Sequence, residues 1–409
     1  MYIQNKLTRQ QNNRLYFLLI VATVGLLTDR LLKPALALIL IADALIFVRK
    51  NFKINKNIFY PIICLMGYSL VQALFYDSNA LLLKELVRSF IYILLIYGVS
   101  NLYIEMKTYE KIWIYILAFC LCVQVMQFFK IADINKYLIK FYGTTEDSDA
   151  IRVANYETLN LFRSGSIFIA INPYFKIVLG VLTIALNKRI TAHTIKLRQN
   201  SLSTAGIIFA VTSSVFIGSR TCFIVIIICI IEYMFFYKKT LLHFDRRMII
   251  YTVIALIILL LSGYFGNLIE RVSNMRMFNI FREDGTTGSL EHKFLTIKHF
   301  MDSNNSLAVF FGRGIYQART KIEQMDSDLG YLYAYYGVFG IIFLYFIVRA
   351  IFIRGKEDPT MNNALGIMWS TVIIFSVVTS GVFLNMRVFG SLIVMFFVNK
   401  YSLEAKRNE

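Results

Sequence analysis

Long apolar runs dominate the chain, and short polar segments separate them. A helix that crosses a bilayer needs about 20 mostly apolar residues. Ten runs come near that length: 57–76, 87–104, 111–129, 166–186, 204–219, 221–237, 247–265, 329–349, 364–382 and 385–399. The stretch 15–48 has charged residues and a proline in its middle, which indicates two short helices joined by a tight turn. The pattern therefore predicts about twelve transmembrane helices.

The composition supports this interpretation. Of the 409 residues, 57% are hydrophobic and only 17% are charged, against about 25% in an ordinary soluble domain. A soluble protein of this size could not bury so much apolar surface. We expect an all-α polytopic membrane protein with a single integral membrane domain, 1–409. A soluble enzyme, a disordered chain and a secreted disulfide-rich protein are excluded.

The net charge of +18 sets the orientation. Membrane proteins keep Lys and Arg on the cytoplasmic side. The positive charge is therefore interpreted as a sign of membrane topology, and a nucleic-acid partner is not predicted. If the N-terminus is cytoplasmic, seven segments on that side carry +16 of the +18: 1–14, 49–56, 105–111, 187–203, 238–247, 349–358 and 400–409. Both termini are then predicted to be cytoplasmic.

Two outward segments are long, at about 130–162 and 266–328. Long loops of this kind typically carry function or are disordered. Within the second, apolar residues recur at helical spacing near 290–301. This spacing predicts an amphipathic helix at the outer interface of the membrane.

Ionisable residues at membrane depth are candidates for function. Arg163 is expected to open the helix 166–186, and Lys176 lies thirteen residues further along, about 20 Å away in a continuous helix. Asn172-Pro173 is expected to break that helix and free backbone carbonyls, which is tolerated where the backbone lines a cavity. The alternative is an Arg163 that reaches to the outer interface and a Pro173 that makes an ordinary kink.

Arg220 lies in a short polar turn, Gly218–Thr221, between two apolar runs. An arginine there could hold a phosphate through its planar fork and the adjacent backbone N–H groups. The turn is equally compatible with a plain hairpin at the interface.

The end of the second long loop holds Arg313 between two glycines, and then Asp326 and Asp328 just before the next apolar run. The two carboxylates could simply cap that helix, or one could act as a general base at the mouth of a cavity. Asp147 and Asp149 form another acidic pair, but such pairs arise easily by chance, and neither a metal nor a cofactor is predicted.

The order of these motifs over 150–345 resembles the Wzy-type polysaccharide polymerases, which are related to the O-antigen ligases. An arginine comes first, followed by a glycine and an Asn-Pro break, and then by a Gly-Ser-Arg-Thr turn. After the long loop come Phe311-Gly312-x-Gly314, Asp328 before Gly330-Tyr331-Leu332, and Tyr336-Gly337-x-x-Gly340. Arg319 with Gly330 eleven residues later also fits the pattern of such loops. The ligases typically have a His-Asn or similar pair where this chain has Asp326-Ser327-Asp328, which favours polymerase over ligase.

The resemblance implies a glycosyltransferase in the bacterial cytoplasmic membrane that has no cofactor. It would move a growing glycan from undecaprenyl pyrophosphate onto the next lipid-linked repeat unit, with Asp328, Arg163 and Arg220 as catalytic residues. Membrane lipid, and possible flippase and chain-length regulator proteins, are the implied partners. The residues expected to bind substrate are Lys176, Arg276, Arg282, His292, Lys293, Arg313, Arg319 and Asp326.

Two other functions stay open. A ligase would move the finished glycan to a different acceptor. A flippase of lipid-linked sugars would also have about twelve helices, but short loops and internally repeated halves are expected of it, and this chain has a long outward loop and no visible half-repeat.

Overall fold

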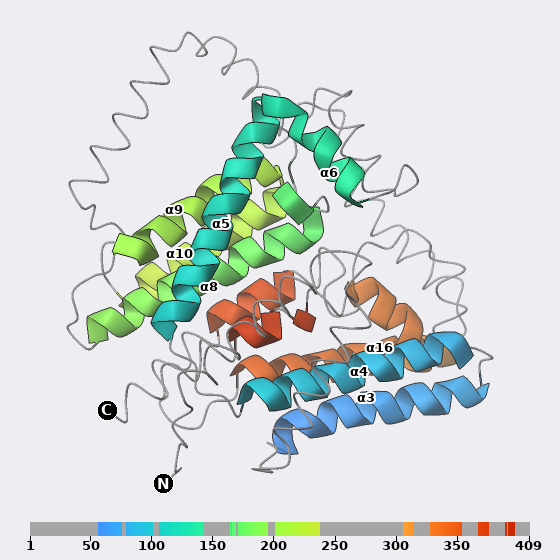
Figure 1. The fold of residues 1–409 in the computed structure, drawn as a ribbon. Helices are drawn as coiled ribbons and strands as arrows, with labels where there is room; N and C mark the ends of the chain where they lie inside the picture. The colour runs from blue at the N-terminus through green and yellow to red at the C-terminus, as the bar shows by residue number, and fades with distance from the viewer. Residues whose placement is uncertain are drawn as a thin grey trace, which may run out of the picture. The chain divides into compact units, whose positions relative to one another are not determined.

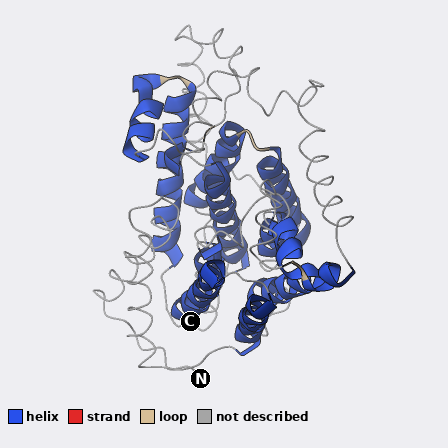
Figure 2. Ribbon diagram, turned by 90° about the vertical axis from the view of Figure 1, so that its right-hand side faces the viewer, coloured by secondary structure: helices blue, strands red, loops and turns tan. Residues whose placement is uncertain are grey.

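The computed structural model describes a helical protein. It describes the backbone of 56–75, 79–100, 106–142, 164, 166–168, 171–194, 201–237, 306–313, 328–353, 367–375, 389–390 and 392–396. Within these ranges nearly every residue is helical and none is in a strand (Figures 1 and 2). The all-α prediction is therefore confirmed for the described part of the chain.

Seven of the described helices overlap predicted apolar runs. They are α3 (Lys56–Phe75), α4 (Asn79–Ser100), α5 (Met106–Phe128), α8 (Ile171–Thr194), α9 (Ser201–Ile217), α10 (Arg220–Tyr237) and α16 (Asp328–Val348). Residues 367–375, 389–390 and 392–396 are helical within the two predicted C-terminal runs. The runs 15–48 and 247–265 lie outside the described residues. Among the described helices, Thr108–Phe128 and Leu329–Ile351 are long and apolar enough to cross a membrane, and four further apolar helices are shorter.

The chain forms two compact units, one made of 1–105 with 285–409 and the other of 106–284. In the second unit α8 is the central helix. It packs against α5, α9 and α10, and its residues from Tyr174 to Asn187 are all buried. A helix that is apolar around its whole circumference belongs in such an interior. Gly206 on α9 permits the close packing, since a Cβ there would lie 3.1 Å from Ile114 of α5 and 3.2 Å from Ala185 of α8.

The first unit is built around α16. This helix packs against α3 and against the short helix α14 (Ser306–Phe311), and α3 packs in turn on α4. Tyr68 of α3 lies among three rings of α16, with centroid distances of 6.0, 5.9 and 5.8 Å to Tyr336, Phe339 and Phe343. Tyr92 of α4 meets Phe389 at 5.0 Å, which brings the C-terminal helical residues into the same unit.

The backbone of α16 breaks at Gly337, where φ is 65° and ψ is −151°. The end of α14 fits against this break. The Arg313 N–H donates to the Ala334 carbonyl at 3.0 Å, and Gly312, with φ of 75°, lies against the backbone of Tyr335. Both glycines have the left-handed conformation that costs other residues energy.

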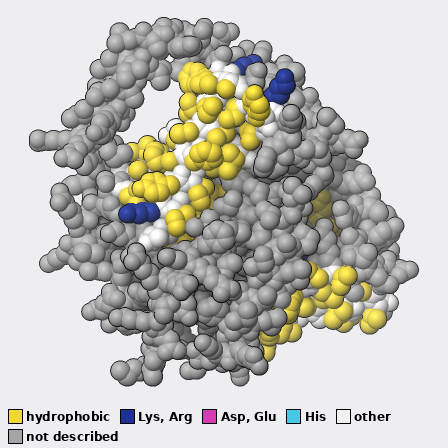
Figure 3. Space-filling view, in the orientation of Figure 1, with side chains coloured by type: hydrophobic (Ala, Val, Ile, Leu, Met, Phe, Trp, Pro, Cys, Tyr) yellow, Lys and Arg dark blue, Asp and Glu magenta, His cyan; other side chains and the backbone are white. Residues whose placement is uncertain are grey.

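Many large apolar side chains are exposed on the described helices. They lie mainly on α3, α4, α5, α10 and α16, and include Leu74, Leu83, Tyr115, Phe235 and Tyr345. Figure 3 shows such side chains in a band that runs along α5 toward its C-terminal end, with basic side chains at the ends of the band. Apolar surface of this extent is typical of a membrane-facing protein, and an apolar band between charged ends is typical of a helix that crosses a bilayer.

The contact between α14 and α16 leads to a prediction about stability. A Cβ at 337 would lie 2.3 Å from the Phe310 carbonyl oxygen, and one at 312 would lie 2.2 Å from the Tyr335 carbonyl oxygen. We expect Gly337→Ala to destabilise the protein by about 4 kcal/mol or more, because steric overlap adds to the cost of the left-handed backbone. The measurement is the melting temperature of the detergent-solubilised protein, with size-exclusion chromatography as the readout of unfolding.

Gly67→Ala is the matched control. Gly67 lies in α3 with open space where its Cβ would be, so alanine should be neutral or stabilise the helix by about 1 kcal/mol. A melting temperature for Gly337→Ala equal to that of the wild type would show that the backbone contact at Gly337 is wrong.

Candidate functional site

A buried polar network lies at one end of the second unit. Gln124 and Gln127 of α5 reach the irregular segment that precedes α8. The Nε2 group of Gln124 donates to the Ser164 carbonyl at 3.4 Å, and that of Gln127 to the Ser166 carbonyl at 3.5 Å. The Ser164 hydroxyl donates to Oε1 of Gln127, and the Ser166 hydroxyl to the Cys120 carbonyl at 2.7 Å.

Helices α8 and α9 complete the network. Nε2 of Gln124 also donates to the Ser213 carbonyl at 3.3 Å. The Tyr174 hydroxyl lies 3.1 Å both from Oε1 of Gln124 and from the Ser213 hydroxyl. The side chains of Gln124, Tyr174 and Ser213 are all fully buried. Because buried polar groups are costly unless they are hydrogen-bonded, this network fixes the segment that enters α8.

The same end of the unit carries the turn that leads into α10. The Ser164 N–H donates to the Phe216 carbonyl of α9 at 3.1 Å. Two residues after Phe216, Gly218 takes a φ of 62°, and the Ser219 hydroxyl accepts from the Cys222 N–H at 3.4 Å as a cap. Arg220 is then the first residue of α10. The turn holding Arg220 and the chain neighbour of Arg163 therefore meet at one place.

The start of α8 differs from the prediction. The structure has an irregular residue at Ser164, a short 3-10 helix at Ser166–Phe168 and an α-helix only from Ile171. Arg163 therefore does not open a helix that continues to Lys176. Pro173 lies in the first turn of α8, where a missing N–H is harmless, so Asn172-Pro173 does not break the helix as predicted. The irregular backbone that the structure describes lies at Ser164 and at Ser166, where φ is 55°.

Lys176 lies in the second turn of α8 and is only 1% exposed. Its Nζ stands 3.4 Å from the centroid of the Phe175 ring, which is a cation–π distance. Lys176 follows Tyr174 of the polar network by two residues, so its side chain leaves α8 on the side opposite to that of Tyr174. A buried amine in an apolar helix stays a candidate for function.

The first unit brings two glycine motifs together. Phe311-Gly312 at the end of α14 lies against Tyr336-Gly337 of α16, and α3 joins them. Nε2 of Gln72 donates to the carbonyls of Phe311 and Tyr335 at 2.6 and 2.7 Å. The Tyr68 hydroxyl donates to the Phe311 carbonyl at 2.9 Å.

Two predicted residues lie on the elements that make this contact. Arg313 follows it and is half-buried. Asp328 is the first residue of α16, where a carboxylate suits the helix N-terminus.

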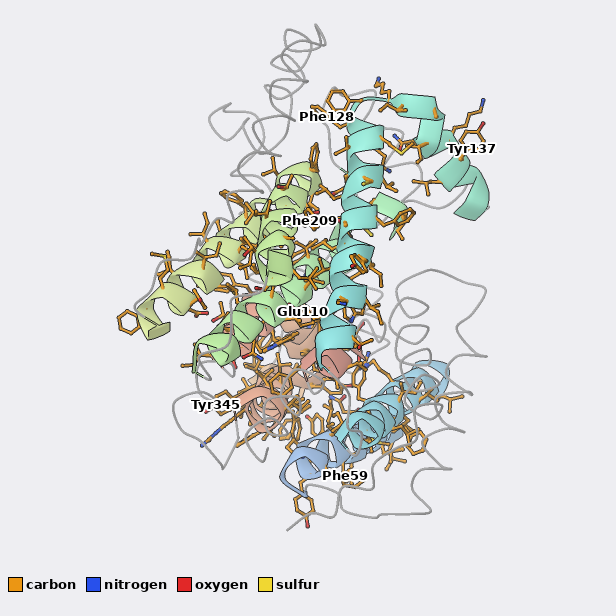
Figure 4. The ribbon with its side chains drawn as sticks, turned by 60° about the vertical axis from the view of Figure 1, so that its left-hand side comes forward. Phe59, Glu110, Phe128, Tyr137, Phe209 and Tyr345 are labelled. Atoms are coloured by element: carbon orange, nitrogen blue, oxygen red, sulfur yellow. The ribbon has the colours of Figure 1, made fainter. Side chains whose placement is uncertain are left out.

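Two buried charged residues were not predicted from the sequence. Arg88 is 5% exposed inside α4, and Glu110 is fully buried inside α5 (Figure 4). Glu110 falls in the segment 105–111 that the charge pattern predicts to be cytoplasmic, and α5 already begins at Met106. Arg88 was not recognised as a residue inside a helix because it lies at the edge of the predicted run 87–104, whereas α4 begins at Asn79.

Several predicted features lie outside the described residues. They are the helix near 290–301, the acidic pair Asp147 and Asp149, and the site residues Arg163, Arg276, Arg282, His292, Lys293, Arg319 and Asp326. In the part of the chain that is described, no three His, Cys, Asp or Glu side chains gather in a way that would hold a metal ion.

Comparison with known proteins does not assign the chain to a family. The chain matches no model of a known protein family, and no curated protein is similar to it in sequence.

The network predicts the effect of removing one hydroxyl. Tyr174→Phe removes the buried hydroxyl that bonds Gln124 and Ser213. The substitution should destabilise the protein by about 1–3 kcal/mol, because the polar atoms of these two residues lose a partner. The melting temperature in detergent measures this. Tyr115→Phe is the control, since Tyr115 of α5 is 62% exposed and its hydroxyl has no comparable role. Equal melting temperatures for both variants would contradict the network.

Proposed function

We propose that the chain is a polysaccharide polymerase of the bacterial cytoplasmic membrane. It would join lipid-linked oligosaccharide repeat units on the outer side by moving the growing glycan from undecaprenyl pyrophosphate onto the next unit. The observation that carries the proposal is the hydrogen bond between Ser164 and Phe216, because it brings the Arg163 segment to the turn that holds Arg220. A pyrophosphate leaving group needs fixed cations.

The proposed topology has twelve spans with both termini cytoplasmic. The charge pattern puts the C-terminal ends of α5 and α9 and the N-terminal ends of α8 and α10 on the outer side. The network links the ends of α5, α8 and α9 by hydrogen bonds, and a short turn joins α9 to α10. The hydrogen bonds thus link helix ends that the charge pattern assigns to the same side, which supports the topology. An odd number of additional spans between α5 and α8 would put the C-terminal end of α5 and the N-terminal end of α8 on opposite sides.

The proposed chemistry is a substitution at the anomeric carbon of the donor. The bond from that carbon to the pyrophosphate oxygen breaks, and a bond to the acceptor hydroxyl oxygen forms. The hydroxyl proton passes to a base, for which Asp328 is our assignment, and undecaprenyl pyrophosphate leaves. Arg163 and Arg220 stabilise the negative charge that develops on the leaving group. Lys176, buried in the second turn of α8, adds positive potential to the same end of the unit.

Substitution of the three assigned residues tests the proposal. We expect Arg163→Ala, Arg220→Ala and Asp328→Ala each to abolish glycan longer than one repeat unit in a deletion strain complemented with the variant. Arg220→Lys should restore short chains only, because a lysine keeps the charge but lacks the planar fork. Glycan length on a gel is the measurement, with the amount of each variant in the membrane fraction determined in parallel.

Lys111→Ala is the control, since Lys111 is exposed near the opposite end of α5 and should leave glycan length unchanged. Full-length glycan stranded on the lipid carrier in the deletion strain would indicate a ligase instead. Repeat units held on the cytoplasmic side would indicate a flippase. Wild-type chain length in all three alanine variants would refute the site.

A further inference from the structure

A short amphipathic helix follows α5 almost at once. After Phe128 the chain turns through a 3-10 helix at Ile131–Asp133 into α6 (Ile134–Tyr142). Helical spacing places Ile134, Tyr137 and Leu138 on one face and Lys136 on another. This stretch falls in the predicted outward segment 130–162, where no helix was predicted.

The apolar side of this element is only partly covered. Ile134 and Leu138 are half-buried, whereas Ile131 is 48% and Tyr137 68% exposed. Among the described elements α6 packs mainly against α5 and the 3-10 helix. Lys130 and Lys136 are both exposed. The element therefore offers apolar and cationic groups side by side.

The corner before α6 sets its direction. Lys130 and Ala132 have φ values of 54° and 55°, which is unusual for residues other than glycine. The chain consequently reverses, and α6 folds back beside the last turns of α5 instead of continuing beyond them (Figures 1, 2 and 4). Figure 4 shows Tyr137 on this returning helix.

The position of α5 determines what α6 can meet. Thr108–Phe128 is apolar enough to cross a membrane, and only two residues separate its end from Ile131. An element tied so closely to the end of a spanning helix lies at the level of the lipid headgroups. Tyrosine is enriched at that boundary, and lysines there are attracted to anionic headgroups.

We infer that residues 131–142 form a membrane-interface anchor. Ile131 and Tyr137 insert into the boundary between headgroups and acyl chains, and Lys130 and Lys136 bind anionic phospholipid headgroups. The occupant of this face is thus the bilayer surface. The inference rests on α5 as a membrane span and not on the polymerase reaction. Its consequence is that the adjacent polar end of the second unit is held at a fixed height relative to the membrane.

Spin labels on the full-length chain test this. The exposed Cys64 and Cys122 are first changed to serine, while Cys120, Cys222 and Cys229 are buried and stay. A nitroxide is then attached at Tyr137→Cys or, as the matched control one residue away, at Lys136→Cys. Protein in vesicles of phosphatidylcholine with phosphatidylglycerol is probed with oxygen, which partitions into lipid, and with a water-soluble nickel chelate.

The label at 137 should be several-fold less accessible to nickel than the label at 136, and more accessible to oxygen. Equal nickel accessibility at both positions would place α6 in water and overturn the inference. Low accessibility of the 137 label to both reagents would mean that protein covers this face, which would overturn it too.

A second comparison tests the lysines. Adding phosphatidylglycerol to phosphatidylcholine vesicles should draw the 137 label deeper, and Lys130→Gln with Lys136→Gln should remove that shift. A shift that persists in the double variant would refute headgroup binding by these two lysines. Neither result depends on glycan synthesis, so failure of the polymerase proposal would be seen separately.

Discussion

The structure depends on one constraint, which is that backbone N–H and C=O groups released from a helix inside an apolar environment need partners. The cost of leaving such a group unsatisfied in lipid is several kcal/mol, roughly the net stability of a small domain. The chain meets this cost at two places with glutamine side chains from a neighbouring helix. Gln124 and Gln127 hold the segment before α8, and Gln72 holds the contact between α14 and the broken α16. An amide suits this task, because it is uncharged and its NH2 group can donate to two carbonyls at once.

The two arrangements have similar consequences for function. An irregular backbone inside a helical unit interrupts the apolar interior and leaves polar positions at defined places. In the second unit that interruption lies beside the turn of Arg220 and precedes the helix that carries the buried Lys176. In the first unit it positions Arg313 directly after the glycine contact. Irregular backbone at membrane depth is tolerated where it is buried in protein or lines a cavity, which is the setting that the proposed chemistry requires.

Hydrophobic pattern predicted most of the described helices, because a run of apolar residues long enough to span is a strong signal. It placed the starts of two helices too late, near charged residues. Arg88 and Glu110 both lie within helices, since packing inside a unit can bury a charge that sequence alone assigns to a boundary. It failed at α8 for the opposite reason, because the apolar pattern begins before the α-helix does. The order of the glycine motifs was visible in the sequence. Their contact was not, because it depends on a positive φ at Gly312 and Gly337 and on a glutamine more than 200 residues away.

The central claim is that this one chain elongates a lipid-linked glycan. The most direct measurement uses the purified protein in liposomes, supplied only with lipid-linked repeat units extracted from the deletion strain. The account predicts a ladder of products that lengthens with time, together with release of undecaprenyl pyrophosphate in an amount equal to the bonds formed. Repeat units that stay single, with no carrier released by protein that is folded and correctly inserted, would contradict it.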